Sequence, residues 1–176
     1  SQGGDEARQI GGYNKRARAK GGGLQYSSSS TQWARKSRFT QENYVKASVL
    51  LHLLGEGTFV DMLTVIGQVA PDPVTKEILV KTRQDEARHV AFGVLSLGDY
   101  YAELSETEIA ERAEFTYEAS RLMRDRLLGR EVYERMGMDV EACLELEFQD
   151  ERSRQFRQLL FANIVPNVKD RKSTRL

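Results

Sequence analysis

The stretch from Val45 to Val69 places apolar side chains at spacings of three and four residues. This periodicity is typical of an α-helix with one wide buried face. Similar spacings recur through most of the 176 residues, and no stretch alternates apolar and polar residues as a half-buried strand does. The sequence therefore predicts an all-α protein. The apolar positions of the first stretch are Val45, Val49, Leu50, Leu53, Leu54, Val60, Leu63 and Ile66.

Two prolines mark the turn after this stretch. Pro71 ends the first helix, and Asp72 is typical of an N-cap because Pro73 follows it at the first helical position. A second long helix is therefore expected over residues 73–101. The short connection suits two antiparallel helices.

Two more helices are expected in the last third of the chain. Ser105 and Glu108 have the spacing of a capping box, which opens a helix that should run to about Met136. A fourth helix should begin at Asp139 and run to about Ile164.

The sequence is expected to form one domain over residues 1–176. Residues 1–20 are typical of the last part of a helix, and the glycine and serine runs of residues 21–32 mark a linker. Residues 40–101 hold the helix pair, and residues 105–176 hold the C-terminal helices.

Charge and cysteine content narrow the function classes. Lys and Arg together number 26, as do Asp and Glu, so no basic field indicates a nucleic acid or an anionic membrane as partner. No signal-peptide pattern is present, and the single cysteine excludes an internal disulfide framework. These features favour a reducing compartment, and we expect a cytoplasmic location.

The string Asp-Glu-Ala-Arg occurs twice, at residues 5–8 and 85–88, followed by Gln9 in the first copy and His89 in the second. On a helix, Glu86 and His89 lie on one face about 5–6 Å apart, so they can bind one metal ion together. A Glu and a His at this spacing also occur often on a solvated polar face.

Glu56 lies inside the first apolar helix, between Leu53, Leu54 and Phe59. A buried carboxylate requires a positive partner. A salt bridge to an arginine is the commoner solution. The alternative is a metal ion, because Glu56 and Glu86 fall at the same level of two antiparallel helices.

The motifs Glu-Gly-Thr-Phe at 56–59 and Asp-Glu-Ala-Arg-His at 85–89 resemble the second half of a ferritin-like di-iron carboxylate protein. The closer similarity is to the oxygen-activating branch, which includes the ribonucleotide reductase small subunit, arylamine N-oxygenases and bacterial multicomponent monooxygenases. The resemblance covers residues 1–100, and residues 105–176 match as further helices of larger members. It implies a ferritin-like four-helix bundle core with additional C-terminal helices.

The resemblance also implies a metal site. In this family each half of the bundle supplies one Glu and one Glu-x-x-His, so Gln9 stands where the first half has a histidine. The lone carboxylate of the first half would lie about 30 residues before Glu6, so the chain is expected to lack its first helix. The implied metal ligands are Glu6, Gln9, Glu56, Glu86 and His89.

The expected cofactor is iron, as two ions or one, with manganese as the alternative. Glutamine is a weaker ligand than imidazole, so the first metal position would be loosely held or empty. Asp5 is expected to support His89, and Asp85 to bond Gln9. His52 is expected either as an extra ligand or as a supporting or packed residue. Tyr13 lies one turn after Gln9 and is a redox candidate, with an ordinary bundle tyrosine as the alternative.

Three functions are left open. The first is an oxygenase or oxidase that uses O₂ and a small organic substrate, with a reductase partner and a homodimeric state. The second is an iron- or peroxide-handling relative of ferritin or rubrerythrin, which the helices after residue 105 disfavour. The third is a degenerate, non-catalytic ferritin-like scaffold.

Overall fold

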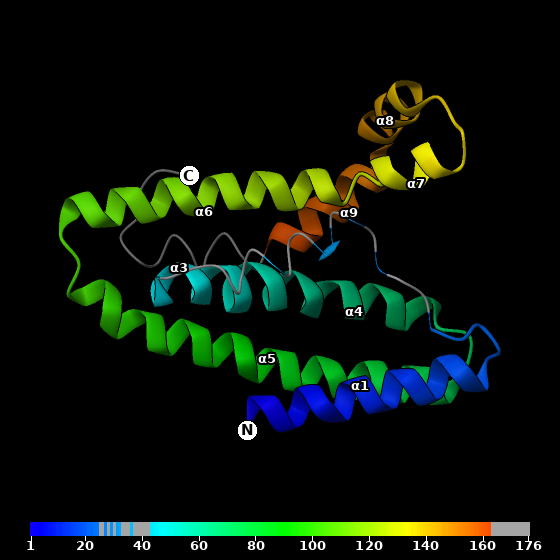
Figure 1. The fold of residues 1–176 in the computed structure, drawn as a ribbon, viewed down its shortest axis with the longest axis horizontal. Helices are drawn as coiled ribbons and strands as arrows, with labels where there is room; N and C mark the ends of the chain where they lie inside the picture. The colour runs from blue at the N-terminus through cyan, green and yellow to red at the C-terminus, as the bar shows by residue number, and fades with distance from the viewer. Residues whose placement is uncertain (25–26, 28, 30, 33–35, 37–42, 163–176) are drawn as a thin grey trace.

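The computed structural model of the chain describes residues 1–24, 27, 29, 31–32, 36 and 43–162. Within these residues the chain forms helices and connecting turns without any strand (Figure 1). The all-α prediction is therefore confirmed.

One long helical rod forms the centre of the molecule. It consists of α3 (Tyr44–Ser48), the π-helical segment η1 (Val49–Glu56) and α4 (Gly57–Val69). Asn43 caps its start, because its side chain accepts a hydrogen bond from the Lys46 backbone N–H at 3.1 Å. The sequence predicted this helix with ordinary α geometry throughout, whereas its middle third is a π-helix, a form often found at functional sites.

Helix α5 (Pro73–Ala102) packs antiparallel on the central rod (Figure 1). Its start was predicted correctly: Asp72 is the N-cap, and its Oδ1 accepts a hydrogen bond from the Thr75 backbone N–H at 2.9 Å. The reversal between the two helices takes only a few residues, which aligns the side chains of one helix with those of the other.

Helix α1 (Gln2–Ala19) lies along α5 and runs antiparallel to it. Asp5, near the start of α1, contacts His89, whereas Arg16, near its end, donates to the Thr75 hydroxyl at the start of α5. These two contacts, near opposite ends of α1, fix which residues of α1 lie opposite which residues of α5.

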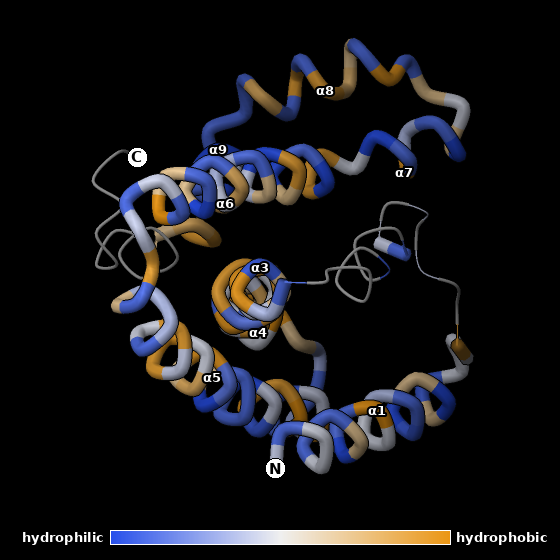
Figure 2. The backbone as a smooth tube through the Cα atoms, turned by 60° about the vertical axis from the view of Figure 1, so that its left-hand side comes forward, coloured by the Kyte–Doolittle hydropathy of each residue, from blue (hydrophilic) through white to orange (hydrophobic). Residues whose placement is uncertain are grey.

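Helix α6 (Glu106–Arg126) lies on the other side of the central rod. Figure 2 shows the apolar rod end-on, with α5 and α1 on one side and α6 on the other. The predicted capping box is confirmed: Ser105 Oγ accepts from the Glu108 backbone N–H, and Glu108 accepts from the Ser105 backbone N–H at 2.9 Å.

Both C-terminal helices are shorter than predicted. The third was expected to reach Met136 but ends at Arg126, and Gly129 adopts a left-handed conformation (φ 64°) before α7 (Arg130–Arg135) begins. A backbone in that conformation cannot continue a right-handed helix.

The predicted fourth helix is broken into α8 (Val140–Gln149) and α9 (Glu151–Ala162). Asp150 lies between them in an extended conformation, and its carboxylate accepts from the Ser153 backbone N–H at 2.7 Å. This aspartate therefore caps α9 instead of continuing α8. The predicted end near Ile164 lies outside the described residues.

Two apolar clusters hold the helices together. The first surrounds Leu54 and Leu97, and the second surrounds Leu63 and Leu79. Between them the central rod and α5 bury polar side chains at helix positions that the apolar pattern would otherwise fill. These buried polar residues include His52, Glu56, Asp85, Glu86 and His89.

By length and composition, Tyr44–Val69 could also cross a membrane, and it is the one such stretch in the described part of the chain. Half of its apolar window is buried inside the protein, and it carries the buried acids Glu56 and Asp61. A buried core helix has the same length and composition, so these features favour a core helix.

Candidate metal centre

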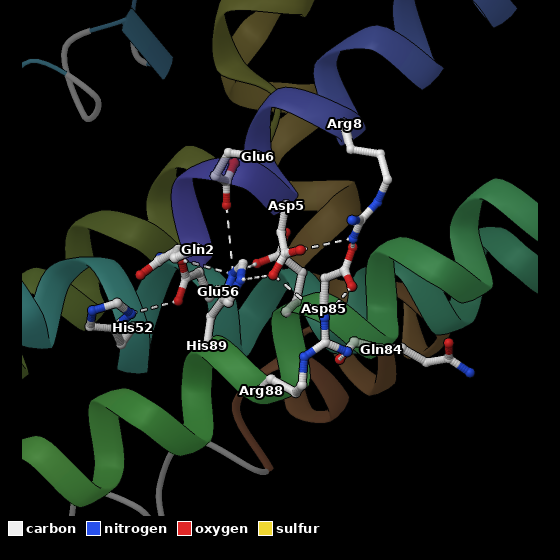
Figure 3. A network of polar contacts seen from close by, with 11 residues as sticks. Gln2, Asp5, Glu6, Arg8, His52, Glu56, Gln84, Asp85, Arg88 and His89 are labelled. Atoms are coloured by element: carbon white, nitrogen blue, oxygen red, sulfur yellow. Dashed lines mark hydrogen bonds and ion pairs between the residues drawn. The ribbon is translucent and has the colours of Figure 1, made fainter.

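Four side chains from three helices converge at one place in the helix bundle. Figure 3 shows Glu6, Glu56 and His89 directed toward one another. Glu6 comes from α1, Glu56 from the end of η1, and Glu86 and His89 from α5. One possible ligand atom of each lies within 4.8 Å of those of the others. Glu56, Glu86 and His89 are buried, while the Glu6 side chain is 46% exposed. The structure thus brings together four of the five predicted ligand residues, which we call the acidic cluster.

The orientation of His89 is set by Asp5. His89 Nε2 lies 3.1 Å from Asp5 Oδ2, within the 2.7–3.2 Å expected of a hydrogen bond (Figure 3). The contact predicted between these two residues is therefore present. Because Nε2 donates to Asp5, the other ring nitrogen is left with a lone pair to offer.

That nitrogen, His89 Nδ1, is buried and makes no hydrogen bond within the described part of the chain. It lies 3.6 Å from an oxygen of Glu6, 3.8 Å from one of Glu56 and 3.6 Å from one of Glu86. Ligands bound at about 2.0–2.2 Å to one ion are separated by distances of about this size. A buried nitrogen left unpaired among three carboxylates therefore fits a cation at their centre.

The carboxylates repel one another in the absence of a cation. Burial, with the charges of Glu6 and Glu56 close by, raises the pKa of Glu86 to about 7. Burial and then Glu56 also raise the pKa of Glu6. The electrostatics of the acidic cluster thus favour an added positive charge.

Glu56 is held from both sides. Gln2 Nε2 donates to its Oε1 at 2.7 Å, and His52 Nδ1 lies 2.7 Å from its Oε2. His52 is not among the four converging residues, and its contact with Glu56 is that of a supporting residue, so a role as an extra ligand stays a prediction. The sequence reasoning missed Gln2, although it lies one turn before Glu6 on the same helix.

The His52 ring sits against α5. It packs edge-on against Phe92 with ring centroids 5.8 Å apart. A Cβ atom on Gly93 would lie 2.2 Å from His52 Cβ, so only glycine allows this approach. The sequence analysis did not identify Gly93 either, because a glycine within a helix does not indicate which side chain packs against it.

Asp85 makes different contacts from those predicted. It was expected to bond Gln9, but its carboxylate accepts from Arg8 and from Arg88, each at 2.5 Å. Although burial raises the pKa of Asp85, these bonds hold it below its usual value. The expectation is wrong because the guanidinium of Arg8 reaches the same carboxylate and bonds it more strongly than a neutral amide.

Gln9 is half-buried, and its buried Nε2 makes no hydrogen bond within normal limits to any residue that the structure describes. Its side chain is still near enough to Glu86 to oppose the rise in the pKa of that carboxyl. Gln9 therefore lies beside the acidic cluster, and a role as metal ligand stays a prediction.

Tyr13 lies in the second apolar cluster, one turn along α1 from Gln9. Its hydroxyl donates to Thr82 Oγ1 at 3.1 Å, and burial raises its pKa. The structure gives it the contacts of a packed bundle tyrosine, and its redox role stays a prediction.

Comparison of the chain with protein-family models, with curated proteins and with solved structures finds no match. The assignment of function therefore depends on the geometry of the acidic cluster itself.

Proposed function

We propose that the acidic cluster binds iron and that the protein is an O₂-activating non-haem iron oxygenase or oxidase acting on a small organic substrate. The observation that carries this proposal is the buried, unpaired Nδ1 of His89 facing the carboxylates of Glu6, Glu56 and Glu86. When bound, the metal would supply the electrons and the binding position needed for O₂ chemistry.

The ligand types support iron, with manganese as the alternative. Three carboxylates and one imidazole form an oxygen-rich set with a single nitrogen, which suits these metals better than soft thiophilic ones. The one cysteine, Cys143, lies on α8 and is not part of the acidic cluster. The four residues can ligate one ion, and a second ion would require further ligands such as Gln9.

The residues of the cluster have unequal freedom. Glu56 is fixed by Gln2 and His52, and His89 is fixed by Asp5. Glu6 is half-exposed and makes no hydrogen bond of normal length with any residue that the structure describes. We infer that Glu6 is the ligand that moves and that small molecules reach the metal from its side.

The bundle arrangement supports a ferritin-like core. The ligands come from α1 and from an antiparallel helix pair, at one level of the bundle, as in carboxylate-bridged metal sites. A reductase that delivers electrons and a homodimeric state are further parts of this proposal.

Metal analysis tests the proposal most directly. The purified protein, incubated anaerobically with ferrous iron and then desalted, should retain iron, and His89→Ala should lose most of it. Glu86→Gln should also lose metal, whereas Glu77→Gln on the same helix should not, because Glu77 is exposed and pairs with Lys81, away from the acidic cluster. Equal metal content in all forms would show that the acidic cluster is not a metal site.

Oxygen consumption separates the oxygenase from iron handling. An oxygenase with a reductant should consume O₂ faster when its substrate is added. A ferritin- or rubrerythrin-like protein should instead consume O₂ or peroxide in proportion to added ferrous iron. A non-catalytic scaffold would do neither.

A further inference from the structure

A second site lies on the opposite side of the central rod from the acidic cluster. It is a cavity of about 1290 Å³ between η1, α6, α7 and α8. Its apolar wall includes Leu50 and Leu54 from η1, Phe115 and Leu122 from α6, and Leu144 and Phe148 from α8. None of the four converging residues of the acidic cluster lines it.

The arginines around this cavity are paired with one exception. Four arginines line the cavity, and three of them lie against carboxylates. These pairs are Arg124 with Asp125 (2.6 Å), Arg130 with Glu141 (2.8 Å) and Arg135 with Glu131 (2.7 Å).

Arg126 is the exception. It is half-buried, and it makes no hydrogen bond or ion pair with any residue that the structure describes. Burial without a counter-charge lowers its pKa, which reflects an unfavourable position for a guanidinium. An unpaired guanidinium in a mostly apolar wall could bind the negatively charged group of a ligand.

The acidic residues of the wall do not fill this role. Glu118 accepts a hydrogen bond from Arg121, and Glu145 accepts one from Gln149. Both are exposed, as is Glu134, so their charges face water and do not reach the half-buried Arg126 as partners.

We propose that this cavity binds a small amphiphilic carboxylate, with its apolar chain against Leu50, Leu122 and Phe148 and its carboxylate on Arg126. The planar guanidinium can donate two parallel hydrogen bonds to a carboxylate. Pockets of this kind, mostly apolar with one placed charge, are typical of small-molecule sites. The proposal requires no metal in the acidic cluster and holds whether or not the protein is an oxygenase.

Calorimetric titration with dodecanoate, below the concentration at which it forms micelles, tests the proposal. The protein should bind dodecanoate more tightly than dodecanol, which has the same chain length without the charge. Decanoate and then octanoate should bind progressively more weakly, by roughly tenfold for each two methylenes removed. Equal affinity for dodecanol and dodecanoate, or no binding of either, overturns the proposal.

Substitution of the arginine provides the decisive comparison. Arg126→Gln should weaken dodecanoate binding roughly 10- to 100-fold, the range for losing a hydrogen bond to a charged group, and should leave dodecanol binding unchanged. Arg126→Lys keeps the charge but cannot donate two parallel hydrogen bonds, so its affinity for dodecanoate should lie between those of the parent protein and Arg126→Gln.

Arg124→Gln is the matched control. It makes the same charge change on the same helix at the same cavity, but Arg124 is exposed and already paired with Asp125. Its dodecanoate affinity should stay within a few-fold of the parent protein. An equal loss in Arg124→Gln and Arg126→Gln would mean that general surface charge, and not a site at Arg126, attracts the ligand.

Discussion

Asp5 Oδ2 lies 3.1 Å from His89 Nε2, across the interface between α1 and α5. This bond turns the other nitrogen of the ring toward the three carboxylates of the acidic cluster. The hydrogen bond to His89 is also the main reason that the pKa of Asp5 is lowered. Asp5 is not one of the four converging residues, but its hydrogen bond determines the orientation of the His89 ring.

Asp5→Ala should therefore weaken metal binding by roughly 10- to 100-fold, the effect typical of losing the carboxylate behind a metal-bound histidine. The measurement is a competition titration of ferrous iron or manganese against a chelating dye. Asp5→Asn, which keeps an acceptor oxygen, should lose less. Asp99→Ala removes an exposed carboxylate from α5 and serves as control. Unchanged affinity in Asp5→Ala would show that Asp5 does not orient the ligand.

Gly93→Ala should destabilise the protein and weaken metal binding together. The added Cβ would lie 2.2 Å from His52 Cβ, so His52 must shift away from Glu56. Overpacking of this kind costs about 1–3 kcal/mol, measurable by urea denaturation.

Gly67→Ala is the control for this change, because nothing lies within 4 Å of the Cβ it would add. It should be neutral, or stabilising by up to about 1 kcal/mol, since alanine favours a helix more than glycine does. If both variants behave alike, the close contact between His52 and Gly93 has no energetic importance.

The parts of the fold that depend on local chemistry were predictable from the sequence. The N-caps at Asp72 and Ser105 and the apolar spacing of residues 45–69 each require only a few neighbouring residues. The meeting of Glu56 with Glu86 followed from their spacing around one tight turn, because antiparallel helices keep their levels over such a distance.

Two kinds of feature were not predictable from the sequence: the points at which a helix is interrupted, and the contacts that depend on the rotation of a helix about its axis. Gly129 and Asp150 each break a helix, yet either residue type can also occur within one. Arg8 and Gln9 are adjacent, and only the rotation of α1 decides which of them reaches Asp85. The hydrogen bond from Gln2 to Glu56 likewise depends on the rotation and register of α1, which a single sequence does not reveal.

Leu97→Ala should be among the most destabilising changes in α5. Leu97 is fully buried in the first apolar cluster, so its truncation should lower the free energy of unfolding by about 2–5 kcal/mol. Leu95→Ala makes the same change two residues away, where the side chain is 74% exposed, and should have little effect. Comparable losses in the two variants would contradict the described rotation of α5.

Asp72 should make the stability of the protein depend on acid pH. The hydrogen bond from the Thr75 backbone N–H, followed by those from the Thr75 hydroxyl, Arg16 and Lys20, holds the pKa of its carboxyl well below the ordinary value of 3.8. A group whose pKa is lowered by folding binds its proton more readily in the unfolded chain. Its contribution is therefore fully present above about pH 4 and is lost as the pH falls further.

Thermal melts of the parent protein and of Asp72→Asn between pH 7 and pH 2 measure this contribution. At pH 7 the variant should melt a few degrees lower, because it loses the charged contacts with Arg16 and Lys20 that join α1 to the start of α5. The difference should shrink below pH 4, where the carboxyl of the parent protein begins to lose its advantage. Other acids titrate in both proteins, so their effects cancel in the comparison. A difference in Tm that stays constant down to pH 2 would show that the charge of Asp72 does not stabilise the fold.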